Sequence, residues 1–121
     1  MLWTRAPFNV AAGGLAAATY NELLSWATPP STPPIRLLSA AAHFSIQTAA
    51  AVTEDFILYV AMASGNVPIA QKRYGLTAAL SNVDLTSVLT APYGPVLGIG
   101  VYVGGSTAYA ASIAGEIETY S

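Results

Sequence analysis

The sequence predicts a mainly β protein, an antiparallel β-sandwich or barrel, and three observations lead to that fold class. After the first 34 residues, turn residues interrupt the chain about every 8–12 residues, as in all-β domains. Apolar and polar residues alternate where strands are expected, for example Phe44 and Ile46 on one face and Ser45 on the other. No charged side chain occurs from Leu85 to Gly115, yet glycines break this stretch and it alternates, which favours strands.

The body of the chain divides into strands separated by turns. Breaks are expected at Ser64-Gly65-Asn66, in the Pro- and Gly-rich segment Ala91-Pro92-Tyr93-Gly94-Pro95, and at Gly104-Gly105-Ser106. One expected strand, residues 55–63, is apolar on both faces, which is typical of a central strand or of a subunit contact. The expected strands are Ile35–Ser39, His43–Thr48, Asp55–Ala63, Pro68–Tyr74, Val83–Thr90, Val96–Val103 and Ala108–Tyr120.

The N-terminal part of the chain is expected to differ from this body. Residues 1–14 should form an extended arm, with Trp3 and Phe8 as apolar anchors that become ordered only on a partner. Apolar residues at 3- and 4-residue spacing predict a helix over Leu15–Trp26. The Pro-rich run from Thr28 to Pro34 ends this helix and favours a stiff spacer. The predicted organisation is an attachment arm, helix and Pro-rich linker over residues 1–34 and a β-sandwich domain over residues 35–121.

The scarcity of charge indicates a subunit of an assembly. Only 8% of the residues are charged, whereas a soluble domain usually has about 25%. Because exposed surface normally needs charge for solubility, we expect much of the surface to be covered by other copies or partners. The net charge is −2 and only four residues are basic, so nucleic acid is not an expected partner. The absence of cysteine excludes a disulfide framework and a thiolate metal site.

No membrane span is expected. The stretches Leu37–Thr53 and Val96–Gly115 are the two that could resemble one, but polar residues interrupt the first and glycines the second. A membrane-active protein using Val96–Gly115 remains an alternative reading, which detergent-free purification would exclude.

Residues for catalysis or for a cofactor are scarce, so no catalytic site, cofactor or metal is predicted. His43 is the only histidine, and Ser45 beside it on the same strand is not aimed at it as a triad would require. Gly98-Ile99-Gly100 lies within a strand and lacks the following Lys-Ser/Thr of a phosphate-binding loop. Glu116 and Glu118 share a strand face, and the sequence leaves two interpretations of them: a solvated surface or a cation site.

Two kinds of residue suggest outward recognition instead. Lys72-Arg73-Tyr74 is the only basic cluster, able to hold an acidic surface or a sugar acid, or simply a solvated strand end. Tyrosines supply large contact areas and tolerate partial exposure. The residues predicted for recognition are Lys72, Arg73, Tyr93 and Tyr102.

The charge-free C-terminal stretch is predicted to form a hairpin. Residues 96–103 and 108–120 would pair around Gly104-Gly105-Ser106, with Ile99 and Val101 in the core. Gly98 and Gly100 would then face a close neighbour, most simply the other subunits of a trimer.

The N-terminal 25 residues carry a resemblance. They contain a Trp-Thr pair, an aromatic anchor, a Gly, a small-residue helix start and an Asn, and in this pattern they resemble the opening of bacteriophage tail-fibre and related virion proteins. The matching residues are Trp3, Thr4, Phe8, Gly14, Ala17, Ala18 and Asn21, while Ala16 and Tyr20 depart from the pattern. The resemblance implies a trimeric, jelly-roll-like β-sandwich head whose arm and helix dock on the virion. The residues it implies for attachment and oligomerisation are Trp3, Phe8, Leu15, Asn21 and Trp26.

The sequence is thus interpreted as a non-enzymatic bacteriophage virion protein, a homotrimeric tail-fibre or receptor-binding subunit exposed on the particle. Its partners would be other tail or capsid proteins and a host-surface glycan or protein. Two alternatives remain open: a capsid decoration protein, of the cement or head-fibre kind, and a small glycan-binding lectin.

Overall fold

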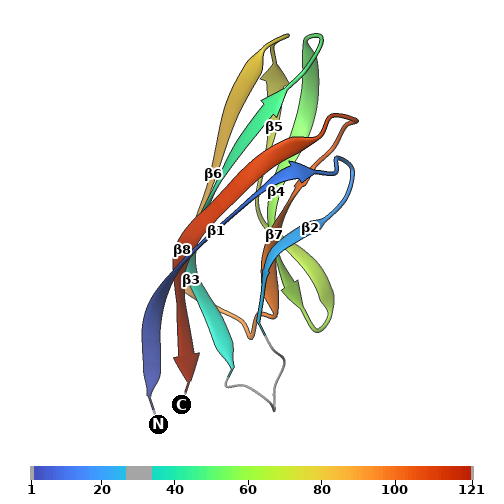
Figure 1. Ribbon diagram of the computed structural model, residues 1–121. Helices are drawn as coiled ribbons and strands as arrows, with labels where there is room; N and C mark the ends of the chain where they lie inside the picture. Colours follow the sequence, from blue (N-terminus) through green and yellow to red (C-terminus); the bar gives the residue numbers. More distant parts are fainter. Residues whose placement is uncertain (1, 27–33, 121) are drawn as a thin grey trace.

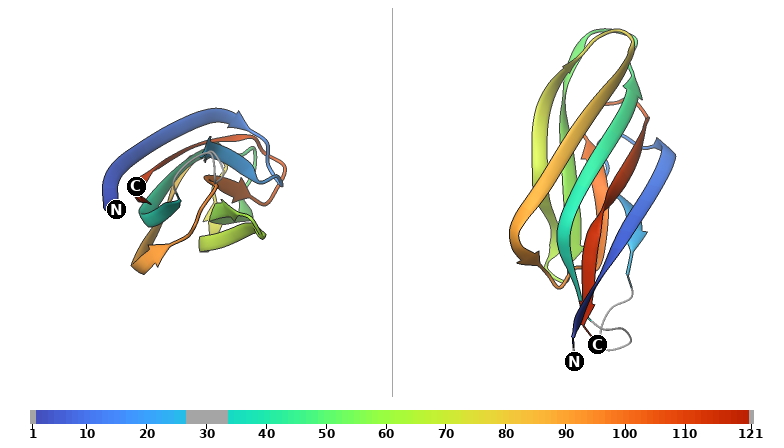
Figure 2. Two further views of the ribbon diagram at one scale, coloured as in Figure 1. Left: turned by 90° about the horizontal axis from the view of Figure 1, so that it is seen from below. Right: turned by 90° about the vertical axis from the view of Figure 1, so that its left-hand side faces the viewer.

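The computed structural model describes residues 2–26 and 34–120, and within them every regular element is a strand (Figure 1). Two four-stranded sheets, both with antiparallel pairing throughout, pack face to face (Figure 2). Sheet A has the order β1-β8-β3-β6, and sheet B the order β2-β7-β4-β5. The strands are β1 Trp3–Leu15, β2 Asn21–Ser25, β3 Ile35–Gln47, β4 Val52–Met62, β5 Gly65–Leu76, β6 Leu80–Tyr93, β7 Gly98–Val103 and β8 Tyr109–Tyr120.

This strand order is that of a jelly roll. Consecutive strands lie in different sheets, except at the hairpin between β4 and β5, and each sheet receives four of the eight strands. Eight strands in two such sheets are the jelly-roll arrangement. The predicted fold class, a jelly-roll-like antiparallel β-sandwich, is therefore confirmed.

The core forms where the inner faces of the two sheets meet. Phe44 of β3 and Phe56 of β4 are fully buried, and their rings meet edge to face across the sandwich at 5.1 Å. Alternation along β3 explains this placement, because Ala40, Ala42 and Phe44 point inward while Ala41 and His43 between them are exposed. The expected strands 35–39 and 43–48 are thus one continuous strand.

The predicted helix over Leu15–Trp26 is wrong. The chain turns at residues 16–20, with Ala18 at φ 54°, and continues as strand β2. The Asn21 side-chain amide lies 2.9 and 3.0 Å from the carbonyl oxygens of Ala16 and Thr19, which closes the turn. Because a lone helix of about 12 residues is marginal in water, pairing with β7 offers this segment more stabilisation than helical propensity does.

The arm is also ordered within the chain itself. Strand β1 pairs with β8 from Trp3 opposite Tyr120 to Ala12 opposite Ala111, so residues 3–15 form an edge strand of sheet A. The expectation of an arm without a fold of its own is therefore wrong, since β8 supplies its backbone partner. The Pro-rich linker falls almost entirely on residues 27–33, outside the described residues.

The predicted C-terminal hairpin is wrong as well. Strand β7 pairs with β2 and β4 in sheet B, whereas β8 pairs with β1 and β3 in sheet A. The turn at Gly104-Gly105-Ser106 carries the chain from one sheet to the other. Ile99 and Val101 are nevertheless buried in the core, as alternation predicted.

The two described chain ends lie next to each other at one end of the sandwich (Figures 1 and 2). Residues 2–26 and 34–120 contain no helix with the length and apolar character needed to cross a bilayer.

The integration of β1 can be tested by truncating its inward anchor. Phe8 packs against the core and meets the Trp26 ring edge to face at 5.9 Å, whereas its neighbour Asn9 points outward. Phe8→Ala should lower the free energy of unfolding by about 2 kcal/mol, roughly half the cost of truncating a fully buried Phe. Asn9→Ala should leave the denaturant midpoint almost unchanged. Equal denaturant midpoints for both variants would contradict the packing of β1 on the core and would indicate an arm that does not contribute to the fold.

Candidate functional site

Three of the four residues predicted for recognition gather in one hollow on the outer face of sheet B. Arg73 comes from edge strand β5 and Tyr102 from β7, while Lys72 borders the hollow from β5 but, paired with the buried Phe56, directs its side chain to the other face. The hollow measures about 390 Å³, and its lining residues are Asp55, Ile57, Gln71, Lys72, Arg73 and Tyr102. The fourth predicted residue, Tyr93, ends strand β6 opposite Leu37 and is half-buried against the core, away from the hollow.

Cross-strand pairing brings these side chains together. Ile57 of β4 lies between Gln71 of β5 and Tyr102 of β7 in one row across the sheet. In the next row Arg73 lies opposite Asp55, with 3.8 Å between the guanidinium Nη1 and the carboxylate Oδ1. Residues distant in sequence thereby form one surface with an apolar centre and a charged side.

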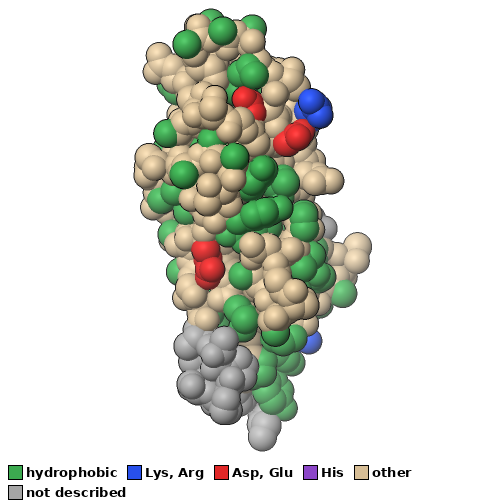
Figure 3. All heavy atoms as spheres, turned by 90° about the vertical axis from the view of Figure 1, so that its right-hand side faces the viewer, with side chains coloured by type: hydrophobic (Ala, Val, Ile, Leu, Met, Phe, Trp, Pro, Cys, Tyr) green, Lys and Arg blue, Asp and Glu red, His purple; other side chains and the backbone are tan. Residues whose placement is uncertain are grey.

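Three tyrosines extend this surface towards β2. Tyr20, in the turn before β2, packs edge to face on Tyr59 at 5.0 Å and lies against Tyr102 at 4.7 Å. Tyr59 is buried beneath the cluster, while Tyr20 is 44% exposed. Figure 3 shows hydrophobic side chains gathered over the middle of this face, with charged groups towards its borders. Sequence reasoning missed Tyr20 because the segment was assigned to a helix.

Charged groups around the hollow are mostly exposed. The Lys72 ammonium lies 5.0 Å from the centre of the Tyr74 ring, a cation–π contact. Burial, and to a smaller extent the negative charge of Asp55, raises the pKa of Glu54 above its usual value. The Asp55–Arg73 pair has more than half of each side chain exposed, so it contributes little to stability.

The residues predicted for attachment pack within this chain. Phe8 and Trp26 contact each other, Leu15 packs on the core, and Asn21 lies 2.9 Å from the Tyr109 hydroxyl. Trp3 meets the Tyr120 ring at 5.0 Å. Each side chain therefore has an intramolecular role, and attachment to other proteins stays a prediction.

A cluster at the chain ends joins β1, β3 and β8. The Arg36 guanidinium lies 3.5 Å from the centre of the Trp3 ring and forms an ion pair with Glu118. Glu116 lies 3.8 Å from Arg5. An arginine thus lies next to each of Glu116 and Glu118, the two residues at which the sequence left a cation site open. Among residues 2–26 and 34–120, no group of three His, Cys, Asp or Glu side chains could hold a metal ion.

Gly98 and Gly100 approach other parts of the same chain. A Cβ on Gly98 would lie 2.2 Å from the Glu22 carboxylate, and one on Gly100 would lie 2.2 Å from the Asn21 carbonyl oxygen. Both glycines are buried within a single copy. Their close neighbour is strand β2 of the same chain, with the Tyr59 side chain over Gly100, and not the other subunits that the sequence predicted.

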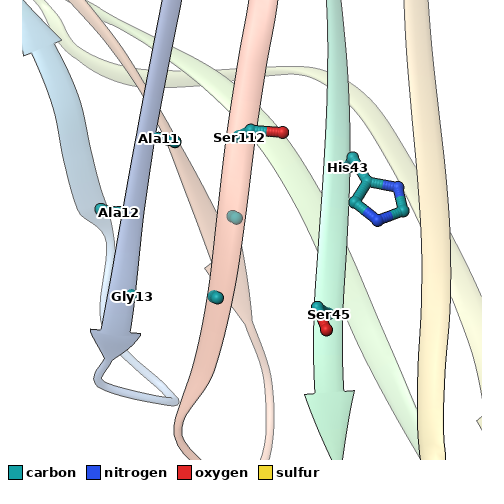
Figure 4. A pocket seen from close by; sticks show the side chains of 8 residues that line it. Ala11, Ala12, Gly13, His43, Ser45 and Ser112 are labelled. Atoms are coloured by element: carbon teal, nitrogen blue, oxygen red, sulfur yellow. The ribbon is translucent and has the colours of Figure 1, made fainter.

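A second hollow, also of about 390 Å³, lies on the outer face of sheet A beside His43 (Figure 4). The His43 Nδ1 lies 2.7 Å from Asp84 Oδ1 on β6, and Ser112 of β8 is the cross-strand neighbour on the other side. Figure 4 shows the imidazole on the β6 side of β3, turned away from Ser112. Within the described residues no hydrogen bond links this serine to the histidine, so the row does not form an acylation triad.

Comparisons with known proteins give only distant structural similarities. No family model matches the chain, and no curated protein matches its sequence. A chain of the Bacillus endospore appendages, described as disulfide-linked pili, is 14% identical and aligns over 98% of this chain and 90% of its own, with a TM-score of 0.47. A chain of turnip yellow mosaic virus is 10% identical over 99% and 93%, with a TM-score of 0.41. PirA is 11% identical over 91% and 92%, with a TM-score of 0.44. None of these similarities is close enough to assign a function.

The pairing of β2 beside β7 predicts a stability effect at Gly100. Gly100→Ala would push a methyl group into the backbone of Asn21 and the Tyr59 ring, and overpacking of this kind costs about 1–3 kcal/mol. Gly75→Ala is the matched control, because a Cβ at that strand position meets nothing within 4 Å. Urea unfolding at one matched protein concentration should separate the two variants. If Gly100→Ala unfolds at the wild-type midpoint, β2 does not lie as close to Gly100 of β7 as described.

The buried Tyr59 predicts a loss of stability in alkali. Burial, followed by the charge of Glu22, raises the pKa of Tyr59 to about 12, and burial also raises the pKa of Tyr109. Below pH 10 both folded and unfolded states keep the Tyr59 proton, and from pH 10 to about 12 only the unfolded state loses it. The free energy of unfolding should therefore fall by up to about 2–3 kcal/mol across that window. Urea titrations should show a smaller fall for Tyr59→Phe than for Tyr93→Phe, and equal falls would contradict this assignment.

Proposed function

We propose that this chain is a non-enzymatic structural subunit of a virion, which assembles through the outer face of sheet A and carries a recognition surface on sheet B. The observation that carries the proposal is the character of the sheet A face. Its two central rows run Ala11-Ser112-His43-Asp84 and Asn9-Ala114-Ala41-Thr86 across β1, β8, β3 and β6.

Small side chains make this face flat. Ala11, Ala41 and Ala114 are exposed, and only Asn9, His43 and Asp84 have side chains larger than threonine in the two central rows. Asp84 is the only Asp, Glu, Lys or Arg in these two rows, while Arg5 and Glu116 lie further along the same face, and the small side chains of the rows allow another surface to approach closely. In a chain with 8% charged residues, covering this face with another copy offers a physical reason for its composition.

The finer parts of the proposal concern symmetry and place. A homotrimer on a bacteriophage tail fibre is supported by the resemblance of the first 25 residues, although those residues form β1 and β2 rather than a free arm and helix. A capsid decoration protein is the second candidate, because the termini and the Trp3–Arg36–Glu118 cluster lie together at one end, where a single attachment point could serve.

The assembly proposal predicts the effect of a charge placed on the flat face. Wild-type protein should sediment as three copies at micromolar concentration, whereas Ala114→Arg should sediment as a folded monomer. Asn66→Arg, at the exposed start of strand β5, is the matched control and should remain trimeric. Circular dichroism checks that both variants are folded. A monomeric wild type, or a trimeric Ala114→Arg, would contradict assembly through this face, and mass spectrometry of purified particles tests the virion location.

A further inference from the structure

We infer that the hollow on the outer face of sheet B binds a sugar that carries a carboxylate, such as a uronic or sialic acid. The inference deepens the recognition part of the proposed function and is independent of the oligomeric state. The volume of the hollow, about 390 Å³, lies in the lower part of the range of small-ligand sites, about 300–1,000 Å³.

The first argument is the availability of positive charge. Arg73 is one of only four basic residues in the chain, and its side chain lines the hollow beside the paired Asp55, whereas Lys72 is paired with the buried Phe56 and points to the other side of the strand. The Arg73 side chain is 74% exposed, and its 3.8 Å contact with Asp55 is too long for a good hydrogen bond. Its planar guanidinium therefore keeps free donors for a carboxylate, which it can bind through two parallel hydrogen bonds.

The second argument is the apolar floor beside this cation. Ile57 and Tyr102 are cross-strand neighbours in the row next to Asp55 and Arg73, and Tyr20 continues the aromatic surface. A pyranose ring has an apolar face of C–H groups that can cover such side chains and bury their area. A cation next to an aromatic floor matches a ring with a carboxylate substituent.

The third argument is the set of neutral and acidic polar groups at the rim. Gln71 supplies an amide that both donates and accepts, and Asp55 supplies a carboxylate that accepts from sugar hydroxyls. A polyphosphate or nucleic acid would meet the Asp55 charge with only the Arg73 cation on this face to offset it. A simple anion would leave the floor of Ile57 and Tyr102 uncovered, so the whole surface fits a hydroxylated ring better.

The test uses saturation-transfer NMR with the methyl glycosides of glucuronic, galacturonic and N-acetylneuraminic acid. Methyl glucoside and methyl galactoside are the matched neutral probes, and inorganic phosphate tests the anion alone. At least one acidic glycoside should bind at least about tenfold more tightly than its neutral counterpart and than phosphate. Absence of binding by all three acids, or equal binding by neutral sugars or phosphate, would overturn the inference.

Variants locate the binding. Arg73→Gln should reduce the affinity for the acid to that for the neutral sugar, whereas Arg5→Gln, on the other sheet, should change nothing. Tyr20→Ala, at an exposed turn position, should weaken both acidic and neutral sugars without unfolding the sheet. Unchanged acid binding by Arg73→Gln would overturn the assignment. Sedimentation of the same samples distinguishes a failure of this inference from a failure of the proposed assembly. If the protein is trimeric but binds no sugar, only the assignment of the hollow is contradicted.

Discussion

The contact between the inner faces of the two sheets is the constraint on which the rest of the structure depends. Each strand must bury one face against the opposite sheet, and Phe44 against Phe56 lies at the centre of that contact. A jelly-roll order satisfies this requirement while the chain passes repeatedly between the sheets. The same requirement draws β1 and β2 into the sandwich, because Phe8 and Trp26 bury apolar area there that they could not bury alone.

Once the inner faces are occupied by the core, the two outer faces are free to differ. Sheet A presents alanine, serine and threonine around His43, while sheet B presents tyrosines beside a hollow with charged walls. The first is suited to close approach by another flat surface, and the second to a ligand with its own shape and charge. The proposed assembly face and the proposed recognition surface thus lie on opposite sides of one small domain.

The candidate site was partly visible in the sequence. Lys72 and Arg73 stood out because basic residues are so rare, and Tyr102 because tyrosine suits exposed contacts. Asp55 and Gln71 could not be connected to them, since cross-strand neighbours are far apart in the chain and depend on register. The same limit applied to His43, whose Asp84 partner lies on β6.

The sequence by itself determined the β-sandwich class, because turn spacing and two-residue alternation follow from the local geometry of strands. Alternation also placed Ile99 and Val101 in the core without knowledge of their partners. Only the tertiary structure decided that residues 21–25 are a strand and that β7 and β8 belong to different sheets. Local propensity cannot decide either point, because strand pairing is made with distant backbone, and the burial gained there outweighs a weak helical preference.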